Sequence, residues 1–294
     1  MQPNSITLAK EKCIDCGACI AVCPRNCFSN NDGAEIQIDT TFCHHCGHCV
    51  SVCPTNALHD KKYPPHAFQA LPEKITDREI TPTLIANFLK SIRSTRAYKD
   101  EKIDRQILTE IIDVIRYAPT GHFSQNVELL LVEQEHTIEQ LKKESARSIR
   151  NFLKKIDNPL TRFFAKLVGK GRAIKQAQEA RPRFTRMLTG FQENKDYLFH
   201  GAPLILIFHG PKDGITLKDN CNQAAAYTRI VAESYGLGSC FIGYLVHFAK
   251  YNPKIKELLQ IPKENIIVQV LIMGKPKYPF RRFVGRPEKE VRWF

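Results

Sequence analysis

The chain carries the run Cys13-Ile14-Asp15-Cys16-Gly17-Ala18-Cys19, which is followed by Cys23-Pro24. The same phrase returns as Cys43-His44-His45-Cys46-Gly47-His48-Cys49, followed by Cys53-Pro54. Eight of the 11 cysteines therefore fall in two copies of one spacing, within the first 53 residues. Each copy offers four thiolates in a short loop, and thiolates are ligands for zinc and for iron–sulfur clusters.

The spacing of each copy is C-x₂-C-x₂-C-x₃-C-P, which resembles the bacterial ferredoxin pattern for [4Fe–4S] clusters. Paired C-x₂-C motifs also bind zinc, but each copy already holds four ligands, and the fourth precedes a proline. Disulfides need an oxidising compartment, and residues 1–12 lack the apolar segment of a signal peptide. We therefore expect two [4Fe–4S] clusters in a cytoplasmic protein.

In ferredoxins with two clusters, the fourth cysteine of each run binds the other cluster. The resemblance thus implies two crossed ligand sets: Cys13, Cys16, Cys19 and Cys53 for one cluster, and Cys43, Cys46, Cys49 and Cys23 for the other. Cys27 lies where the second copy has Ala57, which favours a packing residue over a ninth ligand. The histidines of the second loop, His44, His45 and His48, are interpreted as solvated; the alternative is hydrogen bonding to sulfur or a positive charge that raises a cluster's potential.

The 294 residues divide into three predicted segments. Residues 1–60 form the ferredoxin-type domain, residues 61–82 form a linker rich in proline and lysine, and residues 83–294 form a larger domain with its own core. No stretch has the apolar length of a membrane span.

Periodicity predicts the elements of the larger domain. Helices are expected at residues 83–91, 104–117, 222–235 and 251–259, and apolar strands at 129–132, 203–208 and 266–272. Asp104 is the expected N-cap of the second helix. Alternating helices and strands predict an α+β fold in which helices flank a central mixed sheet.

The net charge of +13 is concentrated in one segment. From Lys142 to Arg186 there are fourteen basic and three acidic residues, and apolar residues at helical spacing predict a basic helical insertion at about 140–190. A solvated surface is the first interpretation, docking of an acidic ferredoxin or flavodoxin the second, and membrane-surface contact the third. Nucleic acid ranks last because no recognition motif accompanies the charge.

Four further stretches resemble motifs of the nitroreductase family of FMN enzymes, in the family's order. The first reads Ser91-Ile92-Arg93-Ser94-Thr95-Arg96-Ala97-Tyr98-Lys99-Asp100, and the others are residues 117–126, 236–243 and 282–286. The resemblance covers about residues 84–293, and the whole chain resembles family members fused to an N-terminal ferredoxin domain. It implies a homodimer with one FMN at each subunit interface.

The resemblance also assigns the FMN contacts. They are Arg93, Ser94, Thr95, Arg96, Arg282 and Arg286 around the phosphate, ribityl chain and ring; Pro119, Thr120, Gly121 and Asn126 in a loop approaching the flavin; and Phe241, Ile242 and Gly243 against the ring. Two positions depart from the family: Ile92 replaces an arginine, and Phe123 stands where asparagine is frequent. No catalytic side chain is predicted, because the flavin carries the redox chemistry.

Together these expectations describe an FMN- and iron–sulfur-dependent oxidoreductase. It relays electrons between the clusters and FMN to reduce a small organic acceptor, such as a nitroaromatic or a quinone. In a variant of this hypothesis, NAD(P)H reduces FMN and the clusters carry electrons out, although no Gly-rich dinucleotide loop is present. A redox-sensing or electron-storage module without substrate turnover is the alternative from another class.

Overall fold

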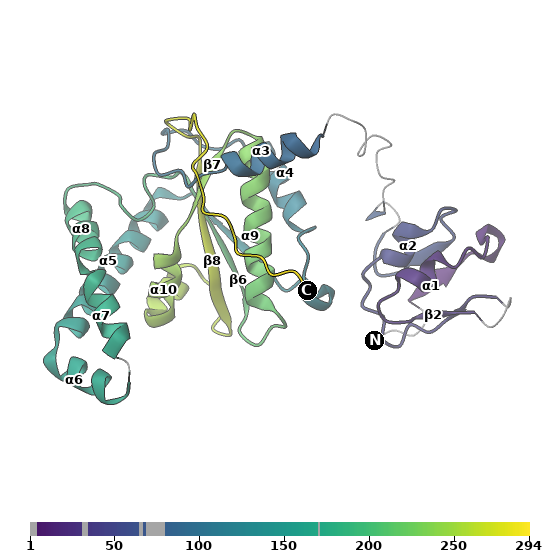
Figure 1. The fold of residues 1–294 in the computed structure, drawn as a ribbon, viewed down its shortest axis with the longest axis horizontal. Coiled ribbons are helices and arrows are strands. Elements are labelled where there is room, and N and C mark those ends of the chain that lie inside the picture. Colours follow the sequence, from purple (N-terminus) through teal and green to yellow (C-terminus); the bar gives the residue numbers. More distant parts are fainter. Residues whose placement is uncertain (1–4, 31–34, 65–66, 69–79, 170) are drawn as a thin grey trace. The chain divides into compact units, whose positions relative to one another are not determined.

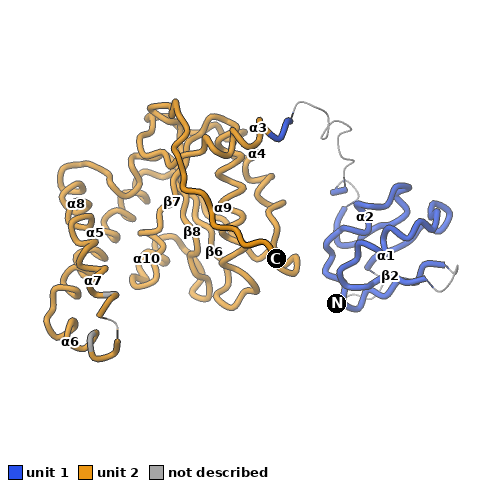
Figure 2. The backbone as a smooth tube through the Cα atoms, in the orientation of Figure 1, with its two compact units in different colours: residues 1–82 blue, residues 83–294 orange. Residues whose placement is uncertain are grey.

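The computed structural model describes residues 5–30, 35–64, 67–68, 80–169 and 171–294 (Figure 1). The chain forms two compact units, residues 1–82 and residues 83–294 (Figure 2). Much of the predicted linker at 61–82 lies outside the described residues, and its last residue, Pro82, begins a helix.

The first unit repeats one small design, as its sequence does. Helix α1 (Ala18–Val22) and helix α2 (His48–Val52) each begin after a glycine with positive φ, 70° at Gly17 and 75° at Gly47, which glycine adopts without steric cost. Strand β1 (Ile6–Leu8) pairs antiparallel with β4 (Leu58–Asp60), and β2 (Phe28–Ser29) with β3 (Gln37–Ile38). A short 3₁₀ helix, η1 (Lys10–Lys12), precedes the first cysteine.

The second unit is built on a four-stranded sheet in the order β5-β6-β8-β7. The strands are β5 (Glu128–Val132), β6 (Leu204–Pro211), β7 (Gly238–Phe241) and β8 (Asn265–Gly274). A parallel bridge between Ser94 and Ser239 of β7 supplies the parallel pairing of the predicted mixed sheet, whereas the four strands themselves pair antiparallel with their neighbours. The reason lies in the connections: Val132 pairs with Ile205, so the chain leaves β5 and enters β6 at the same end of the sheet despite the long helical segment between them.

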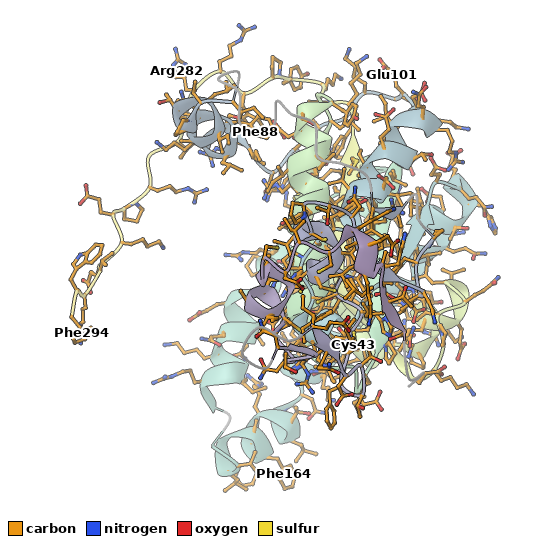
Figure 3. The ribbon with its side chains drawn as sticks, turned by 90° about the vertical axis from the view of Figure 1, so that its right-hand side faces the viewer. Cys43, Phe88, Glu101, Phe164, Arg282 and Phe294 are labelled. Atoms are coloured by element: carbon orange, nitrogen blue, oxygen red, sulfur yellow. The ribbon has the colours of Figure 1, made fainter. Side chains whose placement is uncertain are left out.

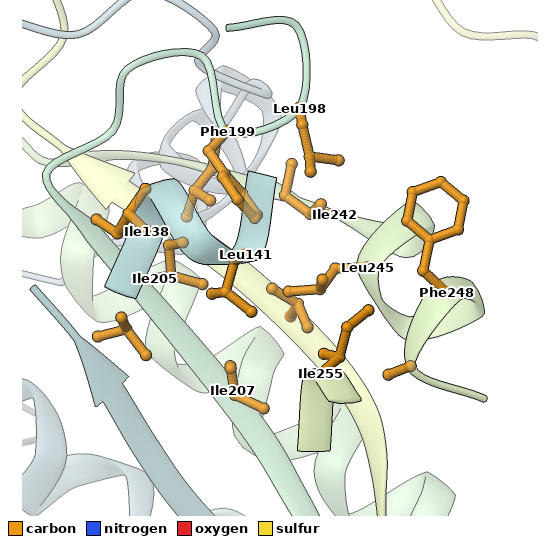
Figure 4. Packing of buried hydrophobic residues seen from close by; sticks show 14 of the residues in the cluster. Ile138, Leu141, Leu198, Phe199, Ile205, Ile207, Ile242, Leu245, Phe248 and Ile255 are labelled. Carbon is orange, nitrogen blue, oxygen red and sulfur yellow. The ribbon is translucent and has the colours of Figure 1, made fainter. Parts of the chain in front are cut away.

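Helices cover both faces of this sheet (Figure 1). Alternate residues of β6 point to opposite faces, so Leu206 packs with α4 (Arg105–Ile115) and α9 (Leu217–Ser234), whereas Ile207 packs with the core of the other face. That second core includes side chains of α5 (Glu135–Asp157), α10 (Gly243–Tyr251) and α11 (Pro253–Leu258) (Figure 4). A strand buried on both faces explains why β6 reads as a continuous apolar run.

The helices predicted from periodicity correspond to α3 (Pro82–Ser91), α4, α9 and α11, and Asp104 caps α4 by accepting a hydrogen bond from the Gln106 N–H at 2.7 Å. A 3₁₀ turn, η3 (Gly121–Phe123), follows α4. The basic segment forms most of α5 and then α6 (Pro159–Leu167), α7 (Gly171–Glu179) and α8 (Arg181–Gln192). Among the described helices none is long and apolar enough to cross a membrane.

Candidate functional site

The eight repeated cysteines line two separate cavities in the first unit. One cavity is lined by Cys13, Cys16, Cys19 and Cys53, and the other by Cys43, Cys46, Cys49 and Cys23. These are the two crossed sets expected from the sequence, with the fourth cysteine of each run turned toward the other run's cavity. Elsewhere in the two cavities, Cys27 and Ala57 occupy matching positions.

Backbone N–H groups point at several of these sulfurs. Ala57 N–H donates to Cys53 Sγ at 3.2 Å, Cys27 N–H to Cys23 Sγ at 3.3 Å, and His45 N–H to Cys43 Sγ at 3.4 Å. Burial raises the pKa of the Cys53 thiol, but hydrogen bonds from the Ala57 backbone, Thr55 and the Leu58 backbone outweigh burial and lower it overall. Donors of this kind favour the thiolate, which is the form that binds metal.

The arrangement of the sulfurs fits a cluster better than a single ion. Within the described ranges, no group of three His, Cys, Asp or Glu side chains converges closely enough to hold one metal ion. A zinc site needs four ligands converging on one point, at about 2.3 Å for sulfur. Sulfurs spread around a cavity instead suit a cube of iron and sulfide, and they suit [4Fe–4S] clusters bound by four cysteines each.

The histidines of the second loop differ in exposure: His48 is exposed, as the first interpretation expects, whereas His44 and His45 are half-buried. His44, His45 and His48 all line the second cysteine cavity. His45 Nδ1 lies 2.9 Å from Asp60 Oδ1, and the Asp60 side chain is fully buried. Asp60 also accepts from the Lys62 N–H at 3.0 Å, so the end of strand β4 fixes the histidine ring. The sequence could not reveal this contact, because 15 residues separate the two partners.

The second candidate site is the arginine motif that follows α3. Thr95 N–H donates to Ser239 O at 3.0 Å, which attaches the motif to strand β7. Further on, Lys99 N–H donates to Lys275 O and Lys277 N–H to Ala97 O, both at 2.9 Å. The motif is thus held as an additional edge segment on β7 and on the chain after β8.

A glycine makes this attachment possible. A Cβ atom at Gly238 would lie 2.3 Å from Thr95 Oγ1, so the buried Thr95 can approach β7 only where the strand has no side chain. Tyr98 anchors the other end of the motif, because its buried hydroxyl donates to Thr95 O at 2.7 Å.

An open cavity of about 770 Å³ lies along this motif. Its lining consists of residues 92–97, Arg229 of α9, residues 278–280 and Arg286. Four arginines, Arg93, Arg96, Arg229 and Arg286, therefore surround one space. Such a space suits an anion, because the guanidinium group matches phosphate oxygens with paired donors.

Two of these arginines have donors without a partner. Arg93 Nε and Arg229 Nε are buried, and neither donates a hydrogen bond to any described residue. Burial lowers the pKa of Arg229, and the nearby charge of Arg93 adds to this effect. Buried unpaired donors are costly, so their convergence on one cavity fits a bound anionic group.

Arg229 was missed by sequence reasoning. It lies in the middle of an ordinary amphipathic helix, and no local pattern distinguishes it from a surface arginine. Only the fold brings it to the cavity, where its guanidinium carbon lies 5.6 Å from the centre of the Phe241 ring. Phe241 itself is half-buried at the end of β7; it contacts Arg229 but is not among the residues that line the cavity.

The structure brings some predicted FMN contacts together and places others elsewhere. Arg93, Ser94, Thr95, Arg96 and Arg286 line the cavity, and Arg93 Nη2 also donates to Val284 O at 3.4 Å. Arg282 is exposed on the C-terminal segment and does not line the cavity.

Ile242 and Gly243 directly follow β7 in the sequence and do not line the arginine cavity. The Ile242 side chain is buried in the core, and its N–H donates to Val270 O at 2.9 Å, so neither can contact a ligand. Gly243 is exposed and begins α10.

The loop containing Pro119, Thr120, Gly121 and Asn126 lies at the opposite end of α9. Gly121 N–H donates to Asn220 Oδ1 at 3.0 Å, and Asn220 Nδ2 donates to Asn126 Oδ1 at 2.9 Å. Asn220 and Arg229 are nine residues apart on α9, which corresponds to about 13 Å along the helix. Within one chain, this loop and the arginine cavity are therefore separate.

Comparisons with known proteins agree with both units. A model of the nitroreductase family matches residues 89–275, and a model of the 4Fe-4S dicluster domain matches residues 12–57. An iodotyrosine deiodinase from Thermotoga neapolitana is 24% identical over 212 residues, which cover 69% of this chain and 97% of that protein. The crystal structure of a nitroreductase with bound FMN from Desulfitobacterium hafniense DCB-2 has the same fold, with a TM-score of 0.53, 14% identity, and coverage of 71% of this chain and 97% of that one.

The family model spans more than half of the chain, and the dicluster model spans both cysteine runs. The two matches fall on the two compact units described above, one on each. The chain belongs to the nitroreductase family, and it is an FMN oxidoreductase with a 4Fe-4S dicluster domain at its N-terminal end.

Proposed function

We propose that this protein relays electrons between two [4Fe–4S] clusters in its first unit and an FMN in its second, and reduces a small organic acceptor. When bound, the clusters would carry single electrons and the flavin would carry pairs. Nitroaromatics and quinones are the acceptor classes that we expect. The observation that carries the proposal is the cavity lined by Arg93 and Arg229, whose Nε donors are buried and unpaired.

The residues around that cavity would hold the cofactor in distinct ways. Arg93, Arg229 and Arg286 would bind the phosphate, since together they present several donors and no acidic side chain lines the cavity. Ser94 and Arg96 would contact the ribityl chain and the ring. Phe241 would supply an apolar surface beside the ring. The protein would thereby orient the flavin and keep it from free solvent.

The cysteine cavities would hold the clusters through the two crossed ligand sets. Backbone N–H groups of Ala57, Cys27 and His45 would stabilise the negative sulfurs. His45 and its partner Asp60 lie beside the second cavity only, so the two sites differ in their surroundings although their cysteine spacing is the same. Differences among the residues that surround the metal ligands would give the two clusters different reduction potentials.

We also propose a homodimer in which both chains build each flavin site. Helix α3 has no buried residue, and its Leu84, Ile85 and Leu89 side chains are all about half exposed. The C-terminal segment is exposed from Lys277 onward, includes Trp293 at 90% exposure, and runs away from the second unit (Figure 3). Large exposed apolar surfaces of this kind indicate a partner. A second chain would also supply the loop at 119–126 that this chain keeps away from its own cavity.

The test starts with anaerobically purified protein, in which iron, sulfide and flavin are counted per chain. We expect about eight irons and one FMN; zinc without sulfide would overturn the cluster assignment. Light scattering after gel filtration then gives the mass in solution, for which we expect twice 33.6 kDa.

Electron transfer is tested by reducing the clusters with a low-potential donor and following flavin absorbance. Loss of oxidised flavin absorbance after the clusters are reduced supports the relay. If the flavin stays oxidised while the clusters are fully reduced, the relay is wrong. Rapid mixing with NADH or NADPH separates the variant in which the flavin is reduced first and the clusters carry electrons out.

A further inference from the structure

Helix α6 exposes the side that a helix normally buries. Leu160, Phe163, Phe164 and Leu167 form one stripe at helical spacing, and their exposed fractions lie between 59% and 67%. Val168, directly after the helix, is 66% exposed. Five large apolar side chains therefore lie together on the surface, which monomeric soluble proteins rarely allow without a function.

The other side of the same helix is the more buried one. Thr161, Arg162 and Ala165 are half-buried, and the helix packs against α5 and α7. Its start is fixed as well, because Asn158 Oδ1 accepts a hydrogen bond from the Leu160 N–H at 2.9 Å. The helix is thus held with its apolar stripe outward.

The position of the stripe makes it accessible. Figure 1 shows α6 at the end of the α5–α8 excursion that lies farthest from the sheet of the second unit. Phe164 points outward from that end (Figure 3). A flat partner could therefore reach the stripe before it reached the body of the unit.

The sequence that carries the stripe is basic. The sequence from residue 158 to residue 178 contains Arg162, Lys166, Lys170, Arg172 and Lys175, and no aspartate or glutamate. On α7, Arg172 and Lys175 are exposed. Apolar side chains bordered by Lys and Arg, on a helix with two phenylalanines, are the features of a helix that lies in the surface of an anionic membrane.

We propose that the tip formed by α6 and the start of α7 docks onto the surface of an anionic lipid bilayer. The stripe would enter the interface between headgroups and acyl chains, and the exposed Arg172 and Lys175 would face the lipid phosphates. A second copy of this chain fits the tip poorly, because it would bring the same positive charge to the contact. An acidic protein would match the charge but leave five large apolar side chains without an apolar partner.

The proposal concerns the surface of the bilayer and not its interior. Helix α6 has nine residues and is therefore about 14 Å long, less than half of the roughly 30 Å of a hydrocarbon core. Docking is thus reversible and sensitive to salt, because part of it depends on screened charges.

The experiment measures co-sedimentation of the full-length holoprotein with vesicles. One set contains phosphatidylcholine alone, and the other contains 30 mol% phosphatidylglycerol. We expect binding to the anionic set, weakened by salt. The variant F163S/F164S should lose at least tenfold in binding, and R172Q/K175Q about 25-fold, since each basic residue near such a surface contributes about fivefold.

The first unit offers a matched control. Phe42 is 61% exposed, as Phe164 is, but lies in the first unit. Phe42→Ser should bind vesicles as the unaltered protein does. Circular dichroism and cofactor content of all variants establish that they are folded.

Three outcomes would overturn the proposal. The first is equal binding to both vesicle sets, or no loss in F163S/F164S. The second is a change of F163S/F164S from dimer to monomer, which would mean that a second copy covers the stripe. The third is absence of vesicle binding together with an F163S/F164S-sensitive complex with an acidic flavodoxin, which would make the tip a protein-docking surface.

Discussion

Replacing Arg229 by methionine separates the two roles that its position gives it. Methionine keeps an unbranched stem against Phe241 and removes the guanidinium group that lines the cavity. A hydrogen bond to a charged group contributes about 1.5–3 kcal/mol. If Arg229 binds the FMN phosphate, loss of one such bond weakens FMN binding by about 10- to 150-fold.

The protein without flavin should respond in the opposite direction. Arg229 Nε is buried and unpaired there, and burial lowers the pKa of Arg229; Arg93 acts in the same direction, whereas Cys240 and Glu233 oppose it. Removing an unpaired buried donor should stabilise the folded state by about 1–3 kcal/mol, and the loss of packing contacts of the arginine side chain offsets part of this gain. We therefore expect the free energy of unfolding of the flavin-free protein to rise by about 1 kcal/mol.

Two measurements decide the matter: FMN affinity from quenching of flavin fluorescence, and urea unfolding of the flavin-free protein. Arg183→Met serves as the control, because Arg183 is an exposed arginine of α8 that does not line the cavity. The reasoning is refuted if Arg229→Met binds FMN as tightly as the unaltered protein. A lower free energy of unfolding would equally show that Arg229 is a structural residue.

Three further predictions, with four substitutions, test other parts of the molecule. Gly238→Ala should lower the free energy of unfolding by about 1–3 kcal/mol and weaken FMN binding, because its Cβ would lie 2.3 Å from Thr95 Oγ1; urea unfolding and flavin titration check this. Cys27→Ala should keep about eight irons per chain, whereas Cys53→Ala should keep far fewer than about four, as iron analysis will show. Burial lowers the pKa of His209 in the folded protein more than Glu128 raises it. Because the histidine of the unfolded chain has a pKa near 6.5, the unfolded chain takes up the proton first, and the free energy of unfolding falls as pH drops below about 6.5. His209→Gln should reduce this pH dependence in unfolding measured from about pH 5 to 8.

The glycine and cysteine changes each have a control within the chain. Gly285→Ala adds a methyl group where no atom lies within 4 Å, so it should leave the free energy of unfolding unchanged. Cys221→Ala removes a buried cysteine of the second unit and should leave the iron content unchanged. A Gly238→Ala protein as stable as Gly285→Ala would show that the motif can move away from β7 at little cost.

Local patterns predicted most of the architecture. The amphipathic periodicity of α4 and α9 and the apolar runs of β6 and β8 arise from burial, which acts on neighbouring residues and is visible in a sequence. Strand β7 was missed, since its glycine, serine and cysteine side chains have no strand pattern; it forms because β8 offers it a partner. The antiparallel pairing of the four strands has no local signal either, because the direction of a strand depends on where distant helices return the chain.

The candidate sites divide in the same way. Cysteine spacing reports a local loop, so the ligand sets could be written down from the sequence. The contact of His45 with Asp60 and the arrival of Arg229 beside Arg93 depend on pairing over long stretches of chain, and no spacing encodes them. Ile242 shows the converse: a motif position that looks available is occupied by a backbone hydrogen bond within the sheet and by core packing.

The crossing of Cys23 and Cys53 between the two cysteine cavities has a consequence for damage by oxygen. Each cavity depends on a thiol that is anchored in the opposite repeat. Oxidative loss of one cluster would release its crossed cysteine, which belongs to the loop that supplies three ligands to the other cluster. Movement of that loop would then disturb the other cluster. Maturation and decay of this unit should therefore be nearly all-or-none, and chains with a single intact cluster should be rare.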